Sequence, residues 1–102
     1  MKGPTQFAGT WVSFEPYDSD DYLIEWVISI DDGVISVTAR DLQDNEEMEI
    51  SEVWFDGTVL LFTSLMPSTG RRGLNRFRLK DNDRIESEFT FTVLEELKRT
   101  SP

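Results

Sequence analysis

The feature that most constrains the fold of this chain is a period-two alternation of apolar and polar residues, interrupted by turn signals about every ten residues. In the stretch YLIEWVISI, residues 22–30, every second residue from the first is apolar. This spacing sends alternate side chains to opposite faces of a strand. Since no long stretch has helical spacing, the sequence predicts an all-β protein.

A first hairpin is expected at the dipeptide Asp32-Gly33, because these residue types tolerate the positive φ angles of a type I′ turn. With this dipeptide as the loop, Trp26 pairs with Ala39 and Glu25 pairs with Arg40. A large ring then lies opposite a small side chain, and the next pair outward is an ion pair. Packing and charge therefore favour the same register.

A second hairpin is expected at Asp56-Gly57. A two-residue loop places Trp54 opposite Val59 on one face. The other face then collects three apolar residues, namely Val53, Leu60 and Phe62. Because both faces are apolar, we expect the second face to be covered by the C-terminal segment, a partner subunit or a ligand.

A third hairpin is expected around a three-residue loop, residues 81–83. This loop sets Arg78 against Glu86 and Arg76 against Glu88 on one face. Apolar side chains then share the other face. The register is predicted because it satisfies the core and the charges together.

Seven strands are expected, near residues 7–14, 22–30, 34–41, 48–55, 58–66, 74–80 and 84–92. The fold class is therefore an antiparallel up-and-down meander of about seven or eight strands, closed into a small barrel or half-barrel that hides its edges. The period changes after Val93, which predicts a short C-terminal helix; a fraying final strand is the alternative. The whole chain, residues 1–102, is expected to be one domain.

The composition excludes several kinds of chemistry. The chain contains neither cysteine nor histidine. This removes disulfides, thiolate and imidazole metal ligands, and the usual general base. No pair of carboxylates suggests acid–base catalysis, and the acidic loops do not match a calcium-binding motif. We expect a protein that is not an enzyme and that has no cofactor and no metal.

The net charge of −10 is distributed unevenly. Residues 1–66 hold 14 acidic and 2 basic residues, whereas the remaining third holds 6 acidic and 8 basic residues. This balance disfavours nucleic acid and anionic membranes, and it would steer a basic partner to the acidic end. No apolar run is long enough for a signal peptide or a membrane span. We therefore expect a cytoplasmic protein that binds neither nucleic acid nor membrane; a secreted protein whose signal peptide has been removed is the alternative.

The first expected strand contains a G-x-W motif, formed by Gly9, Thr10 and Trp11. This motif on a first strand resembles the N-terminal signature of the lipocalin and related calycin families, in which the tryptophan packs over the closed end of a barrel. The resemblance covers the motif and the strand order, and it implies a pocket for a small apolar molecule. The alternative is a glycine and a core tryptophan in another small barrel or sandwich.

A binding module for a small hydrophobic ligand is the leading functional hypothesis. Trp26, Trp54 and Phe89 would form the wall of the pocket, and Glu52 or Tyr22 would supply one polar contact. A barrel of this size is also readily filled by its own side chains. A filled core is therefore the alternative to a pocket.

A protein-interaction or inhibitor module is the competing hypothesis. Its surface would be formed by two acidic loops, with Asp18, Asp20 and Asp21 in the first and Asp44, Glu46 and Glu47 in the second. A homodimer that buries Val53, Leu60 and Phe62 is a further form of the same hypothesis.

Overall fold

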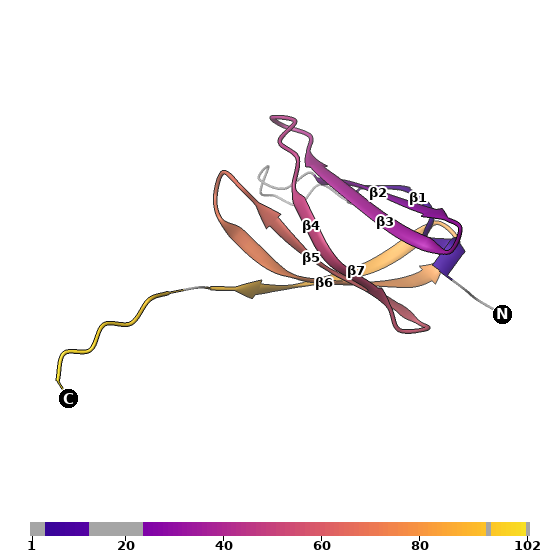
Figure 1. Ribbon diagram of the computed structural model, residues 1–102. Coiled ribbons are helices and arrows are strands. Elements are labelled where there is room, and N and C mark those ends of the chain that lie inside the picture. Colours follow the sequence, from indigo (N-terminus) through magenta and orange to yellow (C-terminus); the bar gives the residue numbers. More distant parts are fainter. Residues whose placement is uncertain (1–3, 13–23, 94, 102) are drawn as a thin grey trace.

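The strands of this protein form two antiparallel sheets that follow the order of the sequence. The computed structural model describes residues 4–12, 24–93 and 95–101. Its elements are a 3-10 helix η1 (Pro4–Phe7) and the strands β1 (Gly9–Trp11), β2 (Ile24–Asp31), β3 (Val34–Asp41), β4 (Glu49–Phe55), β5 (Val59–Met66), β6 (Arg71–Asp81) and β7 (Arg84–Thr92). One sheet has the order β1-β2-β3 and the other β4-β5-β6-β7 (Figure 1). The predicted antiparallel all-β meander is confirmed.

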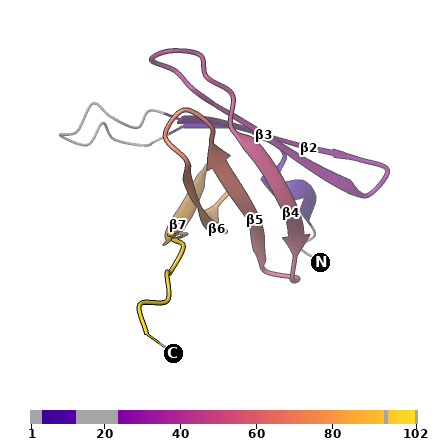
Figure 2. The ribbon, with the colours of Figure 1, turned by 60° about the vertical axis from the view of Figure 1, so that its left-hand side comes forward.

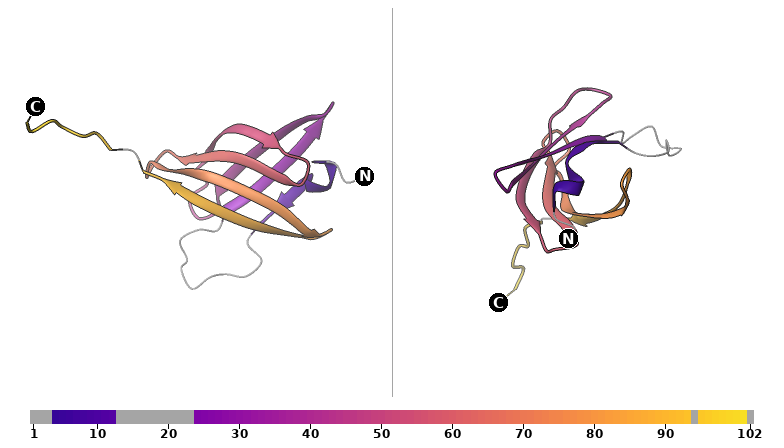
Figure 3. Two further views of the ribbon diagram at one scale, coloured as in Figure 1. Left: turned by 90° about the horizontal axis from the view of Figure 1, so that it is seen from below. Right: turned by 90° about the vertical axis from the view of Figure 1, so that its right-hand side faces the viewer.

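Neither sheet closes into a barrel, so the prediction of closure is wrong. The two sheets instead face each other across the core (Figure 3). Within the described ranges, β1 and β7 are outermost strands that do not pair with each other. In the described residues β1 offers only three residues against nine in β7, so a ladder between them would contain few hydrogen bonds.

The β2–β3 hairpin has the predicted register, with Trp26 opposite Ala39 and Glu25 opposite Arg40. Arg40 Nε lies 3.1 Å from Glu25 Oε1. The turn residue Asp32 has a φ of 52°, as the predicted turn type requires. The hairpin forms a long twisted arm at the upper side of the molecule (Figure 2). Local sequence was sufficient here because the turn, the size match and the charges agree.

The β6–β7 hairpin has the predicted register along its strands, but a bulge between Leu79 and Asp81 pairs Asp81 with Arg84, so the three-residue loop 81–83 does not form. Arg76 lies opposite Glu88 and Arg78 opposite Glu86. The corresponding ion pairs measure 3.6 Å and 3.3 Å between nitrogen and oxygen. The same register places Ser87, Phe89 and Phe91 on the face of β7 that looks toward the three-stranded sheet.

The β4–β5 hairpin differs from the prediction at its turn. Phe55 pairs with Leu60, so the loop is two residues longer than expected. Asp56 explains the difference, because its Oδ1 accepts hydrogen bonds from the N–H groups of Thr58 (2.9 Å) and Val59 (2.7 Å). These bonds hold the four-residue turn closed.

A β-bulge in β4 changes which of its residues share a face. Ser51 pairs with Thr63 and Trp54 with Leu61, which leaves one extra residue on β4. Glu52 within the bulge has a φ of 54°. The extra residue turns Val53 toward the core and Trp54 away from it.

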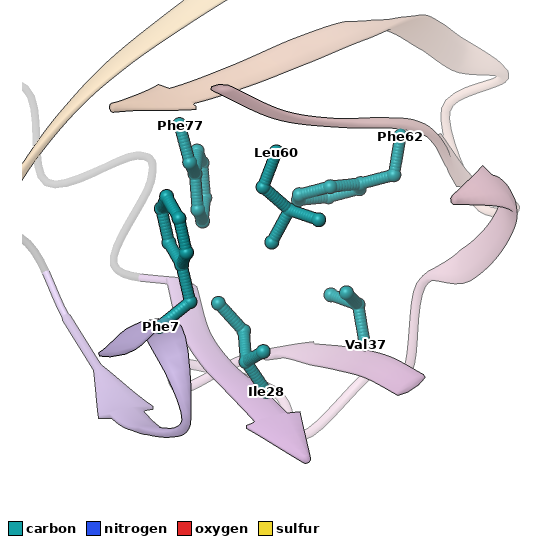
Figure 4. Packing of buried hydrophobic residues seen from close by; sticks show 6 residues of the cluster. All are labelled: Phe7, Ile28, Val37, Leu60, Phe62 and Phe77. Atoms are coloured by element: carbon teal, nitrogen blue, oxygen red, sulfur yellow. The ribbon is translucent and has the colours of Figure 1, made fainter. Parts of the chain in front are cut away.

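The core lies between the two sheets and is built from both. Its fully or nearly buried members are Phe7, Ile28, Val37, Leu60, Phe62 and Phe77 (Figure 4). Trp26 packs edge-to-face on Phe62 and on Phe77, with ring centroids 5.4 Å apart in both pairs. The two phenylalanines are themselves 5.0 Å apart. These three rings join the sheets.

No helix forms at the C-terminus in the described residues, so that prediction is wrong. Residues 95–101 run away from the sheets as an exposed segment (Figures 1 and 3). A helix this short is marginal in water unless it packs against something. Leu97 has no such contact, because its side chain is exposed. Among the described residues, the structure contains no helix with the length and apolarity needed to cross a bilayer.

Phe62→Ala tests the role of the aromatic core. We expect the free energy of unfolding to fall by about 3–5 kcal/mol, because a fully buried ring is removed from a packed site. Urea denaturation followed by tryptophan fluorescence measures the change. Val34→Ala, at an exposed site in the β2–β3 arm, is the control and should change stability by less than about 0.5 kcal/mol. Equal effects of the two substitutions would contradict this account of the core.

Asp56 makes the β4–β5 turn sensitive to acid. The pKa of its carboxyl lies below the ordinary value of 3.8, first because Val59 N–H and then because Thr58 N–H donates to it. A pKa that is lower in the folded state adds stability above the unfolded-state pKa, and this stability is lost as the pH falls through the folded-state pKa.

The variant Asp56→Asn keeps an acceptor but cannot titrate. We therefore expect it to lose less stability than the wild type between about pH 5 and pH 2, measured by urea denaturation at a series of pH values. Asp32→Asn, in the other Asp-Gly turn, serves as the control and should follow the wild type. Parallel profiles for wild type and Asp56→Asn would refute the role of this carboxylate.

Candidate functional site

The residues predicted to line a ligand pocket do not come together. Trp26 lies between the sheets, in contact with the core. Trp54 lies on the outer face of the four-stranded sheet and is 65% exposed. Phe89 lies on β7 and is 37% exposed. The bulge in β4 separates Trp54 from the other two, since it reverses the direction of that side chain.

The two predicted polar contacts do not complete a pocket either. Glu52 is exposed, and its Oε2 accepts a hydrogen bond from Thr63 Oγ1 at 3.1 Å on the outer face. Because Glu52 lies in the bulge, it does not reach a pocket between the sheets. Tyr22 lies outside the described residues.

The predicted second apolar face is part of the core. Leu60 and Phe62 have an exposed fraction of 0%, and Val53 packs against the same cluster. The prediction that these residues form an outer surface is therefore wrong. The three-stranded sheet covers them, so they are not available to a partner of the folded chain.

The first acidic loop, with Asp18, Asp20 and Asp21, lies outside the described residues. The second acidic loop is held by its own hydrogen bonds. Asp44 Oδ1 accepts from Glu46 N–H at 2.9 Å, and the main chain of Glu47 bridges to Arg40. Acidic side chains of this loop therefore form hydrogen bonds that hold the loop in place.

Glu46 ties this loop to the turn between β5 and β6. Its two carboxylate oxygens accept hydrogen bonds from the N–H and the hydroxyl of Ser68, at 2.8 Å and 2.6 Å. Within the described part of the chain, no three acidic residues are arranged to hold a metal ion. The second loop therefore has a structural role, and we call its connection to Ser68 the clasp. Its residues Asp44 and Glu47 are exposed and accessible to a partner.

A group of side chains that we call the aromatic shelf lies on the inner face of the β6–β7 hairpin. It consists of Arg71, Phe89 and Phe91. The two rings meet edge-to-face with centroids 5.3 Å apart. The Arg71 guanidinium carbon lies 4.0 Å from the Phe91 centroid and 5.4 Å from the Phe89 centroid, a cation–π arrangement. Phe91 is still 53% exposed.

Gly73 gives the shelf its shape. A Cβ at this position would collide with the Thr90 carbonyl oxygen and would lie 2.6 Å from two ring atoms of Phe89. The missing side chain therefore lets the Phe89 ring lie over the backbone of β6, which is a known way to cover a strand glycine. Beside it, Asn75 is buried and donates to Ser64 Oγ at 2.9 Å and to the Phe62 carbonyl at 3.3 Å.

The shelf lies on a strand that has a partner on one side only. Within the described residues, β7 is the last strand of its sheet and pairs with β6 alone. Its C-terminal end lies away from β1 (Figures 1 and 3). The backbone groups on the other side of such a strand are available to a further strand.

The sequence analysis named Phe89 as a candidate site residue but not its neighbours Phe91 and Arg71. The alternation of Phe89 and Phe91 correctly indicated one shared face. What the sequence did not reveal is that β7 is an edge strand, because that depends on the barrel remaining open. The glycine at position 73, opposite this pair, was the available signal.

Glu46→Ala tests the clasp between the second acidic loop and the β5–β6 turn. We expect a loss of about 1 kcal/mol in the free energy of unfolding, because two hydrogen bonds to Ser68 disappear. Urea denaturation provides the measurement. Glu47→Ala is the matched control, since its bridge to Arg40 uses the main chain. If the control lost as much stability as Glu46→Ala, the clasp would carry no special role.

Trp11 of the G-x-W motif donates its indole N–H to the Phe7 carbonyl at 2.8 Å and packs against the core. The motif and the meander order are therefore present, and they are compatible with a small β-barrel fold. Comparison of the chain with protein-family models, with curated proteins and with solved structures finds no significant match.

Proposed function

We propose that this protein is a non-catalytic binding module that takes up an extended polypeptide segment along the edge of β7. The aromatic shelf supplies the apolar contacts, with Phe89 and Phe91 as its anchors. Binding of this kind combines main-chain hydrogen bonds, which give affinity, with contacts to alternate side chains, which give specificity.

The observation that carries the proposal is the coincidence of an edge strand with exposed aromatic side chains. β7 is nine residues long and has a strand partner on one side among the described residues. Phe89 and Phe91 project from the same face of it and are 37% and 53% exposed. Exposed aromatic residues beside unpaired backbone groups are typical of interaction sites.

The opposite edge supports the choice of β7. Strand β1 is only three residues long, and it begins at Gly9, whose φ is 143°. An added strand would find few backbone partners there. Of the four outer strands in the described chain, β7 is the longest, with nine residues against three in β1, eight in β3 and seven in β4.

A small hydrophobic ligand on the same shelf is the second candidate. The observation in its favour is that the Phe89 ring lies on the inner face, beside Phe91 and Arg71. The interior between the sheets offers less support, because Trp26, Phe62 and Phe77 pack against one another there.

Phe91→Ser tests the proposed strand addition. The probe is a short synthetic peptide of alternating threonine and valine with a lysine at each end, titrated into the full chain and followed by fluorescence anisotropy. We expect Phe91→Ser to weaken peptide binding about tenfold, because an aromatic anchor is lost. Val34→Ser removes an exposed apolar side chain from the remote β2–β3 arm and should leave binding unchanged.

Hydrogen exchange locates the bound peptide. The amides of residues 84–92 should exchange more slowly when the peptide is present, and those of the β2–β3 arm should not. Equal affinities for both variants and the wild type would contradict the proposal. Saturable quenching of tryptophan fluorescence by an apolar dye, without peptide binding, would favour the small ligand instead.

A further inference from the structure

We infer that the segment bound by β7 is the β7 strand of a second copy of this chain, in an antiparallel register that sets Phe89 opposite itself. This inference rests on the proposed strand addition and names its partner. The two four-stranded sheets would then join into one continuous sheet. A two-fold axis would pass between the two copies of Phe89.

Self-pairing demands a surface that is complementary to itself. In an antiparallel pair with Phe89 opposite itself, Glu88 faces the partner's Thr90 and Glu86 faces the partner's Thr92. No residue of the strand then faces a like charge. Both glutamates also keep their ion pairs with β6, which neutralise them within each copy.

Neighbouring registers are worse for identifiable reasons. If Glu88 were opposite itself, two like charges would meet at the axis, which is destabilising. A further shift in the same direction sets Glu86 against the partner's Glu88. A shift in the other direction, with Thr90 opposite itself, avoids these clashes but pairs only residues 88–92 of the two β7 strands.

The inner face of this pair would cover the apolar groups that are now exposed. Phe91 would lie opposite the partner's Ser87, beside the two copies of Phe89. Val93, which is 81% exposed, would lie opposite the partner's Ile85. Four phenylalanine rings would then gather around the axis, where edge-to-face contacts are favourable.

The edge itself has little protection against pairing. Natural edge strands are commonly blocked by charged side chains, above all lysine, by proline or by a bulge, and the two charges of this edge, Glu86 and Glu88, are paired with arginines of β6. Residues 85–92 contain no lysine, proline or glycine, and their pairing with β6 is regular from Ile85 to Thr92. Among the described residues, no strand other than β6 pairs with β7.

The test begins with the oligomeric state of the full chain, measured by sedimentation velocity over a range of concentrations and salt. We expect a monomer–dimer equilibrium that shifts toward dimer as salt is added. Two copies with a net charge of −10 each repel one another, and salt screens that repulsion. A monomer at every concentration and salt level would overturn the inference.

Thr90→Lys and Thr90→Glu form a matched pair that tests the register. With Phe89 opposite itself, a lysine at position 90 faces the partner's Glu88 and should tighten the dimer about threefold to tenfold. A glutamate there should weaken it by a similar factor. If Thr90 were opposite itself, both variants would weaken the dimer, and that result would overturn the register.

Cross-linking gives an independent measurement, because the chain has no cysteine of its own. Phe89→Cys places two thiols opposite each other and should yield a disulfide-linked dimer on oxidation. Ser87→Cys is the control on the same face. Its two copies would lie about 13 Å apart along the strands, which is too far for a disulfide. Preferential cross-linking of the control would overturn the proposed axis.

The failure of this inference can be told apart from failure of the proposed function. A chain that stays monomeric but binds the threonine–valine peptide overturns the second copy as partner and leaves strand addition intact. A chain that stays monomeric and binds no peptide overturns both.

Discussion

The packing of Trp26 against Phe62 and Phe77 is the interaction on which the rest of the structure depends. These rings come from both sheets and lie in edge-to-face contact. Because the sheets are not joined into a barrel, side-chain packing is the principal force that holds one against the other. The same packing fills the space that a ligand would need in a lipocalin-like pocket.

The bulge at Glu52 and Val53 decides which side chains take part in that core. One extra residue in β4 lets Val53 face inward after Ile50, and it turns Trp54 outward. In a regular strand, Ile50 and Trp54 would lie on the same face and Val53 on the other. Either Trp54 would then point into the interior, or Ile50 would lose its contact with the core. The bulge therefore fits β4 to a core that is already occupied by large rings.

The open side of the sheets gives the molecule its candidate function. If the barrel closed, β7 would gain a second partner, and Phe89 and Phe91 would be interior residues. With the barrel open, they remain on the surface with Arg71 stacked on them. The edge strand and the exposed aromatic shelf both follow from the open barrel, and the proposed strand addition would use both.

The strands and the registers of two of the three hairpins follow from the sequence alone, whereas the expected C-terminal helix does not form in the described residues. Turn chemistry at Asp32-Gly33 and cross-strand charge pairs such as Arg78 with Glu86 are local, so the chain carries them in neighbouring residues. The bulge in β4, the open barrel and the exposure of Phe91 arise only when the two sheets pack together. Each of these depends on which surfaces meet across the core, and an alternating pattern specifies that a face is apolar without specifying what covers it.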